Sequence, residues 1–213
     1  MDRPFELLLV GATGVVGSRV LTAALDDARF ARVIAPTRRP LPTHAKLLNP
    51  VVDFSRLEED APWWRADAVI CTLGTTIKVA GSQAAFAAVD RDLPIRVARL
   101  ARQNGATRFA LNSSLGASRK GNFYLRTKAE AEDGIRAIGF PYFTIVRPSL
   151  IDAQREQSRP GERFAIVFAH LLKSFMPRRY RAVKPEWIAR ALIEGVLAQT
   201  PGERIIESEQ LQF

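Results

Sequence analysis

The sequence predicts an α/β protein of one domain, in which helices cover both faces of a doubly wound, mostly parallel sheet. Short apolar runs alternate with longer stretches of helical period, and this alternation is typical of strand–helix–strand units. The apolar runs are continuous, as expected for strands that are covered on both faces. A chain of 213 residues, 47% of them hydrophobic, is long enough for one well-buried core and slightly short for two.

Each element follows from a local pattern. The apolar runs predict strands at Leu7–Val10, Arg32–Pro36, Pro50–Asp53, Ala68–Cys71, Arg108–Asn112 and Phe143–Arg147. Helical periodicity predicts helices over Val15–Asp27, Ser82–Asn104, Tyr124–Ile138 and Pro185–Gln199. Gly105 and Gly139 follow two of these helices, where a left-handed capping residue is expected, and Pro185 suits a first helical turn.

Residues 1–213 are expected to form this single domain, because neither an internal repeat nor a low-complexity linker divides the chain. The segment Pro148–Arg163 is polar and shows no period, so we expect a long loop there. Loops of this length in compact domains are often lids or binding loops, although surface disorder explains the composition equally well. We therefore expect a substrate-side loop with adjoining helices in about 148–185.

The charge balance favours anionic partners. The chain has 31 Lys and Arg against 22 Asp and Glu, a net charge of +9, so its surface should attract nucleotide phosphates, acidic membranes or nucleic acid. No run of five or six basic residues occurs, so a nucleic-acid arm is not indicated. A solvated basic surface is the simplest interpretation.

Other classes are disfavoured by what the sequence contains. Cys71 is the single cysteine, and His44 and His170 lie far apart, so we expect neither a disulfide nor a metal site. The N-terminal apolar run Leu7–Val10 is too short for a signal sequence. No stretch of about 18 apolar residues occurs, so we expect no membrane span and a cytoplasmic location.

A glycine turn follows the first strand. Gly11 permits the tight turn, Gly14 lets the backbone approach phosphates, and Gly17 lets the helix pack on the strand. Strand, glycine turn and helix in this order form the context that a dinucleotide diphosphate requires. The N–H groups that would face it belong to Thr13, Gly14, Val15 and Val16. A glycine-rich turn without a ligand is the alternative, and the Gly-Lys-Ser/Thr ending of a P-loop is absent.

The second strand ends in "VIAPTRRP", where NAD-selective sites usually carry an acid. Arg38 and Arg39 stand there instead, and two cations favour the 2'-phosphate of NADP(H). A charged hydrogen bond from arginine contributes about 1.5 to 3 kcal/mol. The alternative is a solvated arginine pair. Asp53 and Phe54 could contact the adenine, and "CTLGTT" brings Leu73, Gly74 and Thr75 near a ribose.

The stretch "FYLRTKAEAE" spaces Tyr124 and Lys128 four residues apart on an expected helix, so both side chains share one face. A neighbouring ammonium favours the ionised phenol, which makes proton exchange easier. Lys128 could also bind the nicotinamide ribose. The preceding strand ends in "LNSSLGA", which supplies Ser113 and Ser114. An accidental Tyr-x-x-x-Lys pair is the alternative, and this context argues against it.

Together the glycine turn, "SSLGA", Tyr124-x-x-x-Lys128 and "TIVRPSLI" resemble the atypical short-chain dehydrogenases/reductases. The chain is more specifically similar to the Tat-interacting-protein-like oxidoreductases, through "CTLGTT", "VDRD", "NSSLGASRKGNFYLRTKAEAE" and "VRPSLIDAQREQSRPGER". The resemblance covers nearly the whole chain, although the glycine turn matches only the general Gly-x-x-Gly-x-x-Gly form.

This resemblance implies a Rossmann fold, NADP(H) as cofactor and Tyr124 as the group that exchanges a proton. It also implies that Ser114 is the catalytic serine, with Ser113 as the fallback. In that family the loop after the sixth strand covers the nicotinamide, so Pro148 would contact the cofactor and Pro148–Arg159 would select the substrate.

Two functions follow. The first is NADPH-dependent reduction of a small carbonyl compound, and the second is a redox sensor that binds NADPH without turnover. Epimerase or dehydratase chemistry on a nucleotide sugar is disfavoured, because so short a chain leaves little room for a sugar-binding domain. A protein partner or a second copy of the chain is compatible with either function.

Overall fold

The computed structural model describes residues 3–152 and 177–212. Its strands are β1 (Phe5–Val10), β2 (Phe30–Ile34), β3 (Leu47–Leu48), β4 (Ala68–Cys71), β5 (Arg108–Asn112), β6 (Tyr142–Arg147) and β7 (Gly202–Glu207). Its α-helices are α1 (Val15–Asp26), α2 (Ile77–Ala80), α3 (Gln83–Ala87), α4 (Leu93–Gln103), α5 (Phe123–Arg136) and α7 (Pro185–Val196). A π-helical turn, η2 (Ala88–Asp92), joins α3 to α4, and short 3-10 turns are η1 (Pro62–Trp64), η3 (Arg178–Tyr180) and η4 (Ser208–Leu211).

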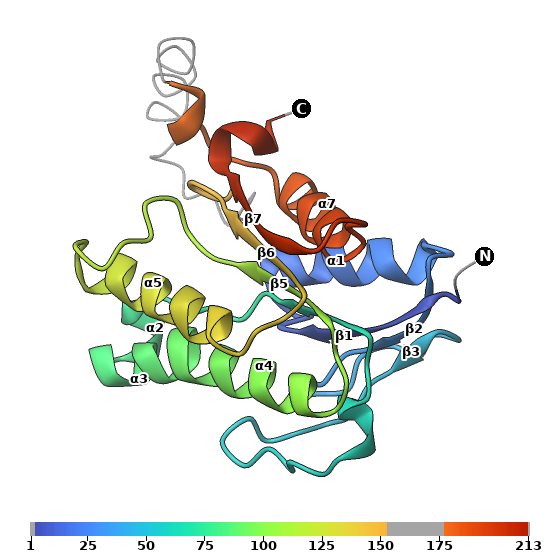
Figure 1. Cartoon of the computed structure of the whole chain (residues 1–213). Coiled ribbons are helices and arrows are strands. Elements are labelled where there is room, and N and C mark those ends of the chain that lie inside the picture. The colour runs from blue at the N-terminus through green and yellow to red at the C-terminus, as the bar shows by residue number, and fades with distance from the viewer. Residues whose placement is uncertain (1–2, 153–176, 213) are drawn as a thin grey trace, which may run out of the picture.

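The strands form one parallel sheet of order β3-β2-β1-β4-β5-β6-β7 (Figure 1). The chain builds outward from β1 to β3 and then returns to place β4 on the other side of β1. The strand order therefore reverses between β1 and β4, whose carboxyl ends are at Val10 and Cys71. Ligands of open α/β sheets bind at such a reversal. The predicted doubly wound Rossmann sheet is confirmed.

Two layers of helices cover the sheet, with α1 and α7 on one face and α4 and α5 on the other (Figure 1). Side chains along β1 point alternately to the two faces of the sheet and contribute to a hydrophobic core on each face. Leu7 and Leu9 pack in the cluster with α1 and α7, and Leu8 and Val10 pack in the cluster with α4. All four are fully buried, which explains the continuous apolar run.

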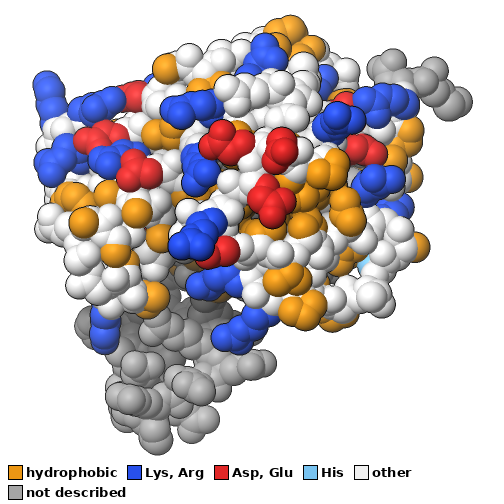
Figure 2. Space-filling view, turned by 90° about the horizontal axis from the view of Figure 1, so that it is seen from below, with side chains coloured by type: hydrophobic (Ala, Val, Ile, Leu, Met, Phe, Trp, Pro, Cys, Tyr) orange, Lys and Arg blue, Asp and Glu red, His pale blue; other side chains and the backbone are white. Residues whose placement is uncertain are grey.

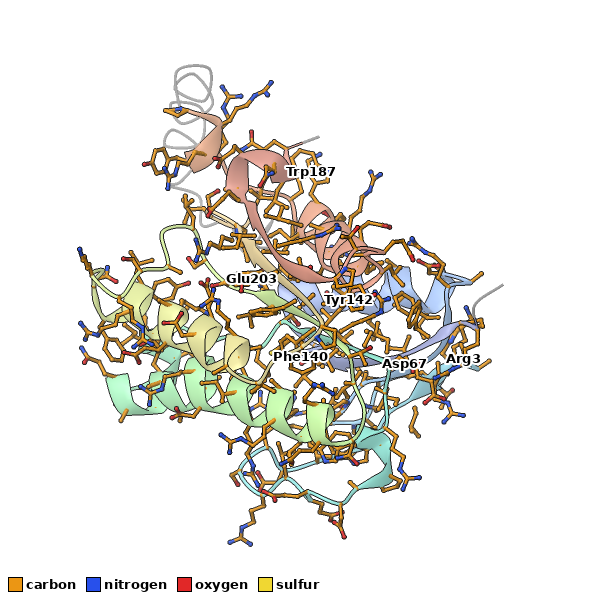
Figure 3. All side chains as sticks on the ribbon, in the orientation of Figure 1. Arg3, Asp67, Phe140, Tyr142, Trp187 and Glu203 are labelled. Carbon is orange, nitrogen blue, oxygen red and sulfur yellow. The ribbon has the colours of Figure 1, made fainter. Side chains whose placement is uncertain are left out.

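Contacts of one arginine hold the amino ends of β5 and β6 and the end of α7 together. Tyr142, which is labelled in Figure 3, is the first residue of β6. The Arg108 guanidinium lies 3.9 Å from the centre of its ring. It also donates hydrogen bonds to the carbonyls of Val196 and Ala198 at the end of α7. These contacts fix the strand ends that lie away from the reversal point.

The strand prediction is wrong in two places. Pro50–Asp53 is not a strand: β3 is Leu47–Leu48, and Val51 makes only an isolated bridge with Thr37. Pro50 has no N–H to donate, so the ladder is interrupted there: the Asn49 side-chain amide donates to the Ala35 carbonyl, while the Pro50 carbonyl still accepts from the Thr37 N–H. The prediction also missed β7, because Gly202–Glu207 is a largely exposed edge strand without a continuous apolar run.

The helix predicted over Ser82–Asn104 is present as three consecutive pieces, α3, η2 and α4. The left-handed conformations of Gly105 (φ +101°) and Gly139 (φ +76°) confirm both predicted helix ends. Pro185 occupies the first turn of α7, as predicted. Of the substrate-side segment in about 148–185, residues 153–176 lie outside the described part of the chain.

The face seen in Figure 2 carries Lys and Arg side chains interspersed with Asp and Glu. Exposed ion pairs of this kind contribute little to stability. Among residues 3–152 and 177–212, no helix is long and apolar enough to cross a membrane. The same residues hold no cluster of three or more His, Cys, Asp or Glu side chains that could bind a metal ion.

Candidate cofactor and catalytic site

The glycine turn between β1 and α1 is built for close backbone contact. Gly11 has φ +96°, and a Cβ there would lie 2.7 Å from the Thr72 Oγ1. A Cβ on Gly17 would lie 2.0 Å from the carbonyl oxygen of Gly11. Both positions therefore require glycine. A Cβ on Gly14 would meet only the Gly11 carbonyl oxygen, at 3.4 Å, so the Gly14 side of the turn is open.

The amino end of α1 can receive an anion. Its N-cap residue, Gly14, supplies no side-chain hydrogen bond, and its first turn contains no acid. The N–H groups of a first helical turn have no partner inside the helix, and the helix dipole adds positive potential. Thr13, Gly14 and Val15 are exposed there, whereas Val16 and Gly17 are buried against the sheet. The turn therefore fits the diphosphate of a dinucleotide.

The carboxyl end of β4 is bound to the same turn. The Thr72 hydroxyl lies 3.2 Å from the carbonyl oxygens of both Val10 and Gly11. The "CTLGTT" motif then continues through Leu73, Gly74 and Thr75, of which Gly74 is exposed. A Cβ on Gly74 would lie 3.7 Å from the Lys128 Nζ. The motif and the lysine thus lie next to each other in the structure.

Lys128 is buried, and its ammonium pairs with a carboxylate that was not predicted as a site residue. The Lys128 Nζ lies 2.6 Å from the Asp90 Oδ1, and both side chains are almost inaccessible. The second carboxylate oxygen of Asp90 accepts a 2.9 Å hydrogen bond from the Thr75 N–H. Asp90 sits in the π-helical turn η2, a feature frequent at functional sites. In the sequence Asp90 is only one acid in a helical run, and the one signal for it is that it belongs to the motif "VDRD".

Tyr124 lies in the first turn of α5 beside the lysine. The helix begins at Phe123 because the Asn122 side chain caps it, accepting a hydrogen bond from the Leu125 N–H. The Lys128 Nζ lies 5.9 Å from the centre of the Tyr124 ring, so the two side chains share a face as the spacing predicts. The half-buried ring packs against Phe86 with centroids 5.6 Å apart.

The two serines after β5 differ in their surroundings. Ser113 is buried, and its hydroxyl donates a 2.5 Å hydrogen bond to the Glu132 carboxylate. Glu132 pairs with Arg147 at 2.6 Å, and Arg147 pairs with Glu207 at 3.0 Å. The hydrogen bond from Arg147 to Glu132 raises the pKa of the Arg147 guanidinium above its usual range. Ser113 thus joins a network that links β5, α5, β6 and β7.

Ser114 is half-buried, and among residues 3–152 and 177–212 its hydroxyl has no hydrogen-bond partner. Its carbonyl accepts from the Ala117 N–H at 3.1 Å, which turns the chain away from the strand. Pro148 follows β6 on the neighbouring loop, and its carbonyl accepts from the Leu115 N–H at 2.8 Å. Pro148 therefore lies next to the serine turn. Of Pro148–Arg159, residues 153–159 are outside the described part.

Arg38 and Arg39 follow β2 and are exposed. The Thr37 hydroxyl holds this turn by donating a 2.6 Å hydrogen bond to the Arg39 carbonyl. Within the described ranges neither guanidinium has an ion-pair partner. Both are thus available to an anion at the carboxyl edge of the sheet.

The Val52 N–H donates a 2.9 Å hydrogen bond to the Thr37 carbonyl, which brings the Asp53 loop beside the arginine turn. Asp53 is exposed and accepts hydrogen bonds from the Ser55 hydroxyl and N–H, which lower the pKa of its carboxyl group. Phe54 is half-buried and packs against the cluster on the α4 side of the sheet. The two residues border the region where an adenine is expected.

Residues 11–165 match the family model described as NAD(P)H-binding. The chain is 33% identical over 204 residues to the protein HTATIP2 of Rattus norvegicus, covering 93% of this chain and 84% of that protein. It is also 33% identical over 214 residues to "Protein fmp52, mitochondrial" of Emericella nidulans, covering 96% of this chain and 90% of that protein.

Solved structures of the same fold include MoeE5 in complex with UDP-glucuronic acid and NAD, with a TM-score of 0.71, 18% identity and coverage of 95% of this chain and 76% of that one. The Bordetella bronchiseptica enzyme WbmH in complex with NAD+ has a TM-score of 0.69 and 18% identity, over 96% of this chain and 76% of that one. The sequence matches and the fold together make the chain a member of the NAD(P)H-binding atypical short-chain dehydrogenase/reductase family.

Proposed function

We propose that the protein is an NADPH-dependent reductase of a small carbonyl compound. The observation that supports it most is the position of Lys128: its ammonium is buried beside the Tyr124 ring and next to the Gly74 turn. Burying a charge is costly unless it is paired, and the pair with Asp90 keeps the lysine's positive charge inside the site at this point. A cofactor ribose bound at the turn would meet the lysine, and a substrate beyond it would meet the phenol.

In this proposal NADPH, when bound, supplies a hydride to the carbonyl carbon. Tyr124 donates its phenolic proton to the oxygen, so that the carbonyl becomes an alcohol, and the Ser114 hydroxyl donates a hydrogen bond to the same oxygen. Lys128 supplies the positive charge that makes release of the phenolic proton easier. Acid catalysis of this kind contributes about 10²- to 10⁴-fold.

Ser114 is the proposed catalytic serine because its hydroxyl is free of partners among the described residues, whereas that of Ser113 donates to Glu132. The proposed contacts with NADP(H) are the glycine turn, Leu73–Thr75, Lys128 and Pro148. Arg38 and Arg39 are proposed to bind the 2'-phosphate, since they are exposed and without ion-pair partners in the described ranges.

A second candidate is a sensor that binds NADPH and reports redox state to a protein partner without turnover. The presence of Tyr124, Lys128 and Ser114 beyond the carboxyl edge of one sheet favours chemistry. NADPH oxidation should be measured against a panel of aldehydes, ketones and quinones, with cofactor binding followed by fluorescence in parallel. A Tyr124→Phe variant should lose at least about 100-fold in turnover and keep its affinity for NADPH. Tight binding without turnover on any compound would support the sensor.

The compartment is a separate proposal. We propose a cytoplasmic location, while the fungal relative from Emericella nidulans carries "mitochondrial" in its name. Fractionation of cells that express the tagged full-length chain would decide between the two. Substrate selection is proposed to lie in about 148–185.

A further inference from the structure

The buried pair of Asp90 and Lys128 has a feature that the proposed reduction does not use. A lysine alone would suffice to bind a ribose and to assist the phenol. Instead its Nζ lies 2.6 Å from a carboxylate whose side chain is 0% exposed. Burying an ion pair is costly unless its geometry and further hydrogen bonds compensate, so its presence needs a reason.

The pair is the local source of charge in this part of the site. The neighbouring thiol of Cys71 is influenced by both charges, but burial raises its pKa to about 11, so it is neutral at pH 7. The next charged groups on η2, Arg91 and Asp92, pair with each other at 2.7 Å and lie nearer the surface. Removal of either buried partner would thus leave one uncompensated charge beside the cofactor region.

Asp90 also contacts the ribose turn directly. Its second oxygen accepts a hydrogen bond from the Thr75 N–H, and a Cβ added at Gly74 would lie 3.4 Å from the Asp90 Oδ1, in van der Waals contact with it. One carboxylate therefore joins three things: the π-helical turn, the motif after β4 and the ammonium of α5. A shift of the lysine must disturb the turn as well.

We propose that Asp90 is a positioning residue that holds Lys128 against the Leu73–Thr75 turn and, as its counter-charge, sets the balance between binding of the oxidised and the reduced cofactor. This inference rests on the proposed function, since it places the nicotinamide next to Lys128. The two forms of the cofactor differ by one positive charge on that ring. A nearby carboxylate favours the oxidised form, a nearby ammonium disfavours it, and the pair compensates both effects.

The test is the ratio of two dissociation constants. NADP+ and NADPH are titrated separately by calorimetry into the full-length protein and its variants, well below the melting temperature of each. Asp90→Asn keeps a side-chain oxygen for the Thr75 N–H and removes the negative charge. This variant should raise the dissociation constant of NADP+ by about threefold or more relative to that of NADPH. Lys128→Met should shift the ratio in the opposite direction by a similar factor.

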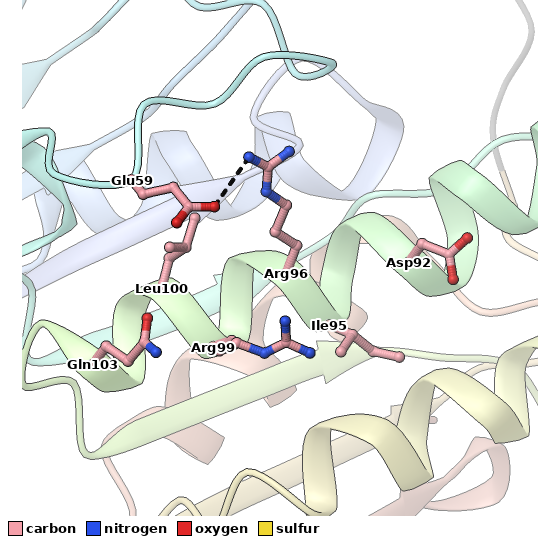
Figure 4. A pocket seen from close by; sticks show the side chains of 7 residues that line it. All are labelled: Glu59, Asp92, Ile95, Arg96, Arg99, Leu100 and Gln103. Carbon is pink, nitrogen blue, oxygen red and sulfur yellow. Dashed lines mark hydrogen bonds and ion pairs between the residues drawn. The ribbon is translucent and has the colours of Figure 1, made fainter.

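A matched control comes from the same turn. Asp92, two residues after Asp90, faces the surface at a hollow of about 490 Å³ on α4 (Figure 4). Its side chain is 54% exposed. Asp92→Asn should leave the ratio within about twofold of the parental value, because an exposed charge is screened by water.

The two single variants are expected to shift the ratio in opposite directions, so if one of them fails to fold because a lone charge is buried, the other one decides. The double variant Asp90→Asn/Lys128→Met leaves neither charge behind and serves as the charge-neutral control. Its ratio should return close to that of the parent protein. If Asp90 has only a structural role, its replacement should lower the affinity for NADP+ and NADPH equally, and the ratio of the two dissociation constants should stay unchanged in both single variants. That result would overturn the inference and leave the proposed function intact. If the parent protein binds neither cofactor form, the proposed function falls and the inference with it.

Discussion

The Ser113 hydroxyl donates its hydrogen bond to Glu132, on the helix that also carries Tyr124 and Lys128. The serine nearest the end of β5 is thereby engaged in holding a strand to a helix. Its neighbour Ser114 has no such engagement among the described residues. Ser113 therefore has a structural role, and Ser114 is the serine that is available for the proposed reaction.

Replacement of the two serines should give different losses. Ser114→Ala should lower kcat by about 10- to 100-fold with little change in the free energy of unfolding, because it removes a hydrogen bond to the reacting oxygen. Ser113→Ala should cost about 1 to 3 kcal/mol in stability, since Glu132 loses a buried donor. Steady-state kinetics and urea denaturation measure the two effects. The assignment is reversed if Ser113→Ala gives the catalytic loss and Ser114→Ala the loss of stability.

The arginine turn should discriminate between cofactors. The double variant Arg38→Ala/Arg39→Ala is expected to lower the affinity for NADPH by about 10- to 100-fold, since it removes charged hydrogen bonds to the 2'-phosphate. The affinity for NADH, which lacks this phosphate, should change by less than about twofold. The double variant Arg65→Ala/Arg99→Ala removes two other exposed arginines, one of them on α4 in the hollow of Figure 4, and serves as the control for net charge. Equal losses for NADPH and NADH would argue against NADP selectivity.

Two glycines of one turn should respond differently to the same added methyl group. Gly17→Ala would place a Cβ 2.0 Å from the Gly11 carbonyl oxygen, so we expect a loss of about 2 kcal/mol or more in stability. Gly14→Ala meets a single contact at 3.4 Å and should fold. It should nevertheless weaken dinucleotide binding, because the methyl group occupies the open side of the turn. Thermal melts with and without NADPH distinguish the cases, and a Gly14→Ala protein that binds like the parent would refute the diphosphate assignment.

Cys71 makes stability depend on pH in the alkaline range. Burial raises its pKa to about 11 from an ordinary value of 9.0, so above pH 9 the unfolded chain releases a proton that the folded chain keeps. The contribution of this thiol is therefore fully present below about pH 9 and is lost as the pH rises through about 11. The loss amounts to about 2 to 3 kcal/mol.

A Cys71→Ala variant should be less stable than the parent at pH 7, because it leaves a small cavity, and the difference should narrow between pH 9 and 11. Urea denaturation at several pH values measures both trends. Parallel curves for the two proteins over this range would mean that the thiol does not titrate differently on unfolding.

Sequence could predict whatever depends on neighbours along the chain. The glycine turn needs its three glycines within one short segment, and the spacing of Tyr124 and Lys128 fixes their common face on any helix. The same holds for the left-handed residues Gly105 and Gly139, which end helices by local geometry. These parts of the fold and of the site follow from short segments of the chain, whatever packs around them.

What escaped prediction depends on contacts between distant segments. Asp90 reads as one acid in a helical run, and only the packing of η2 against α5 brings it to Lys128. The involvement of Ser113 with Glu132 is likewise set by how β5 lies on α5. The apolar run at Pro50–Asp53 predicted a strand wrongly, because Pro50 lacks an N–H and only an isolated bridge at Val51 follows it.

The ion pairs from Glu132 to Arg147 and from Arg147 to Glu207 place the support of the serine turn partly on β7, the last strand of the sheet. During synthesis on the ribosome, β5 and α5 emerge well before that strand does. A nascent chain therefore contains the glycine turn, Tyr124 and Lys128 before Glu207 is available to pair with Arg147. Assembly of the complete site must be a late event, because it waits for a strand that is translated long after α5.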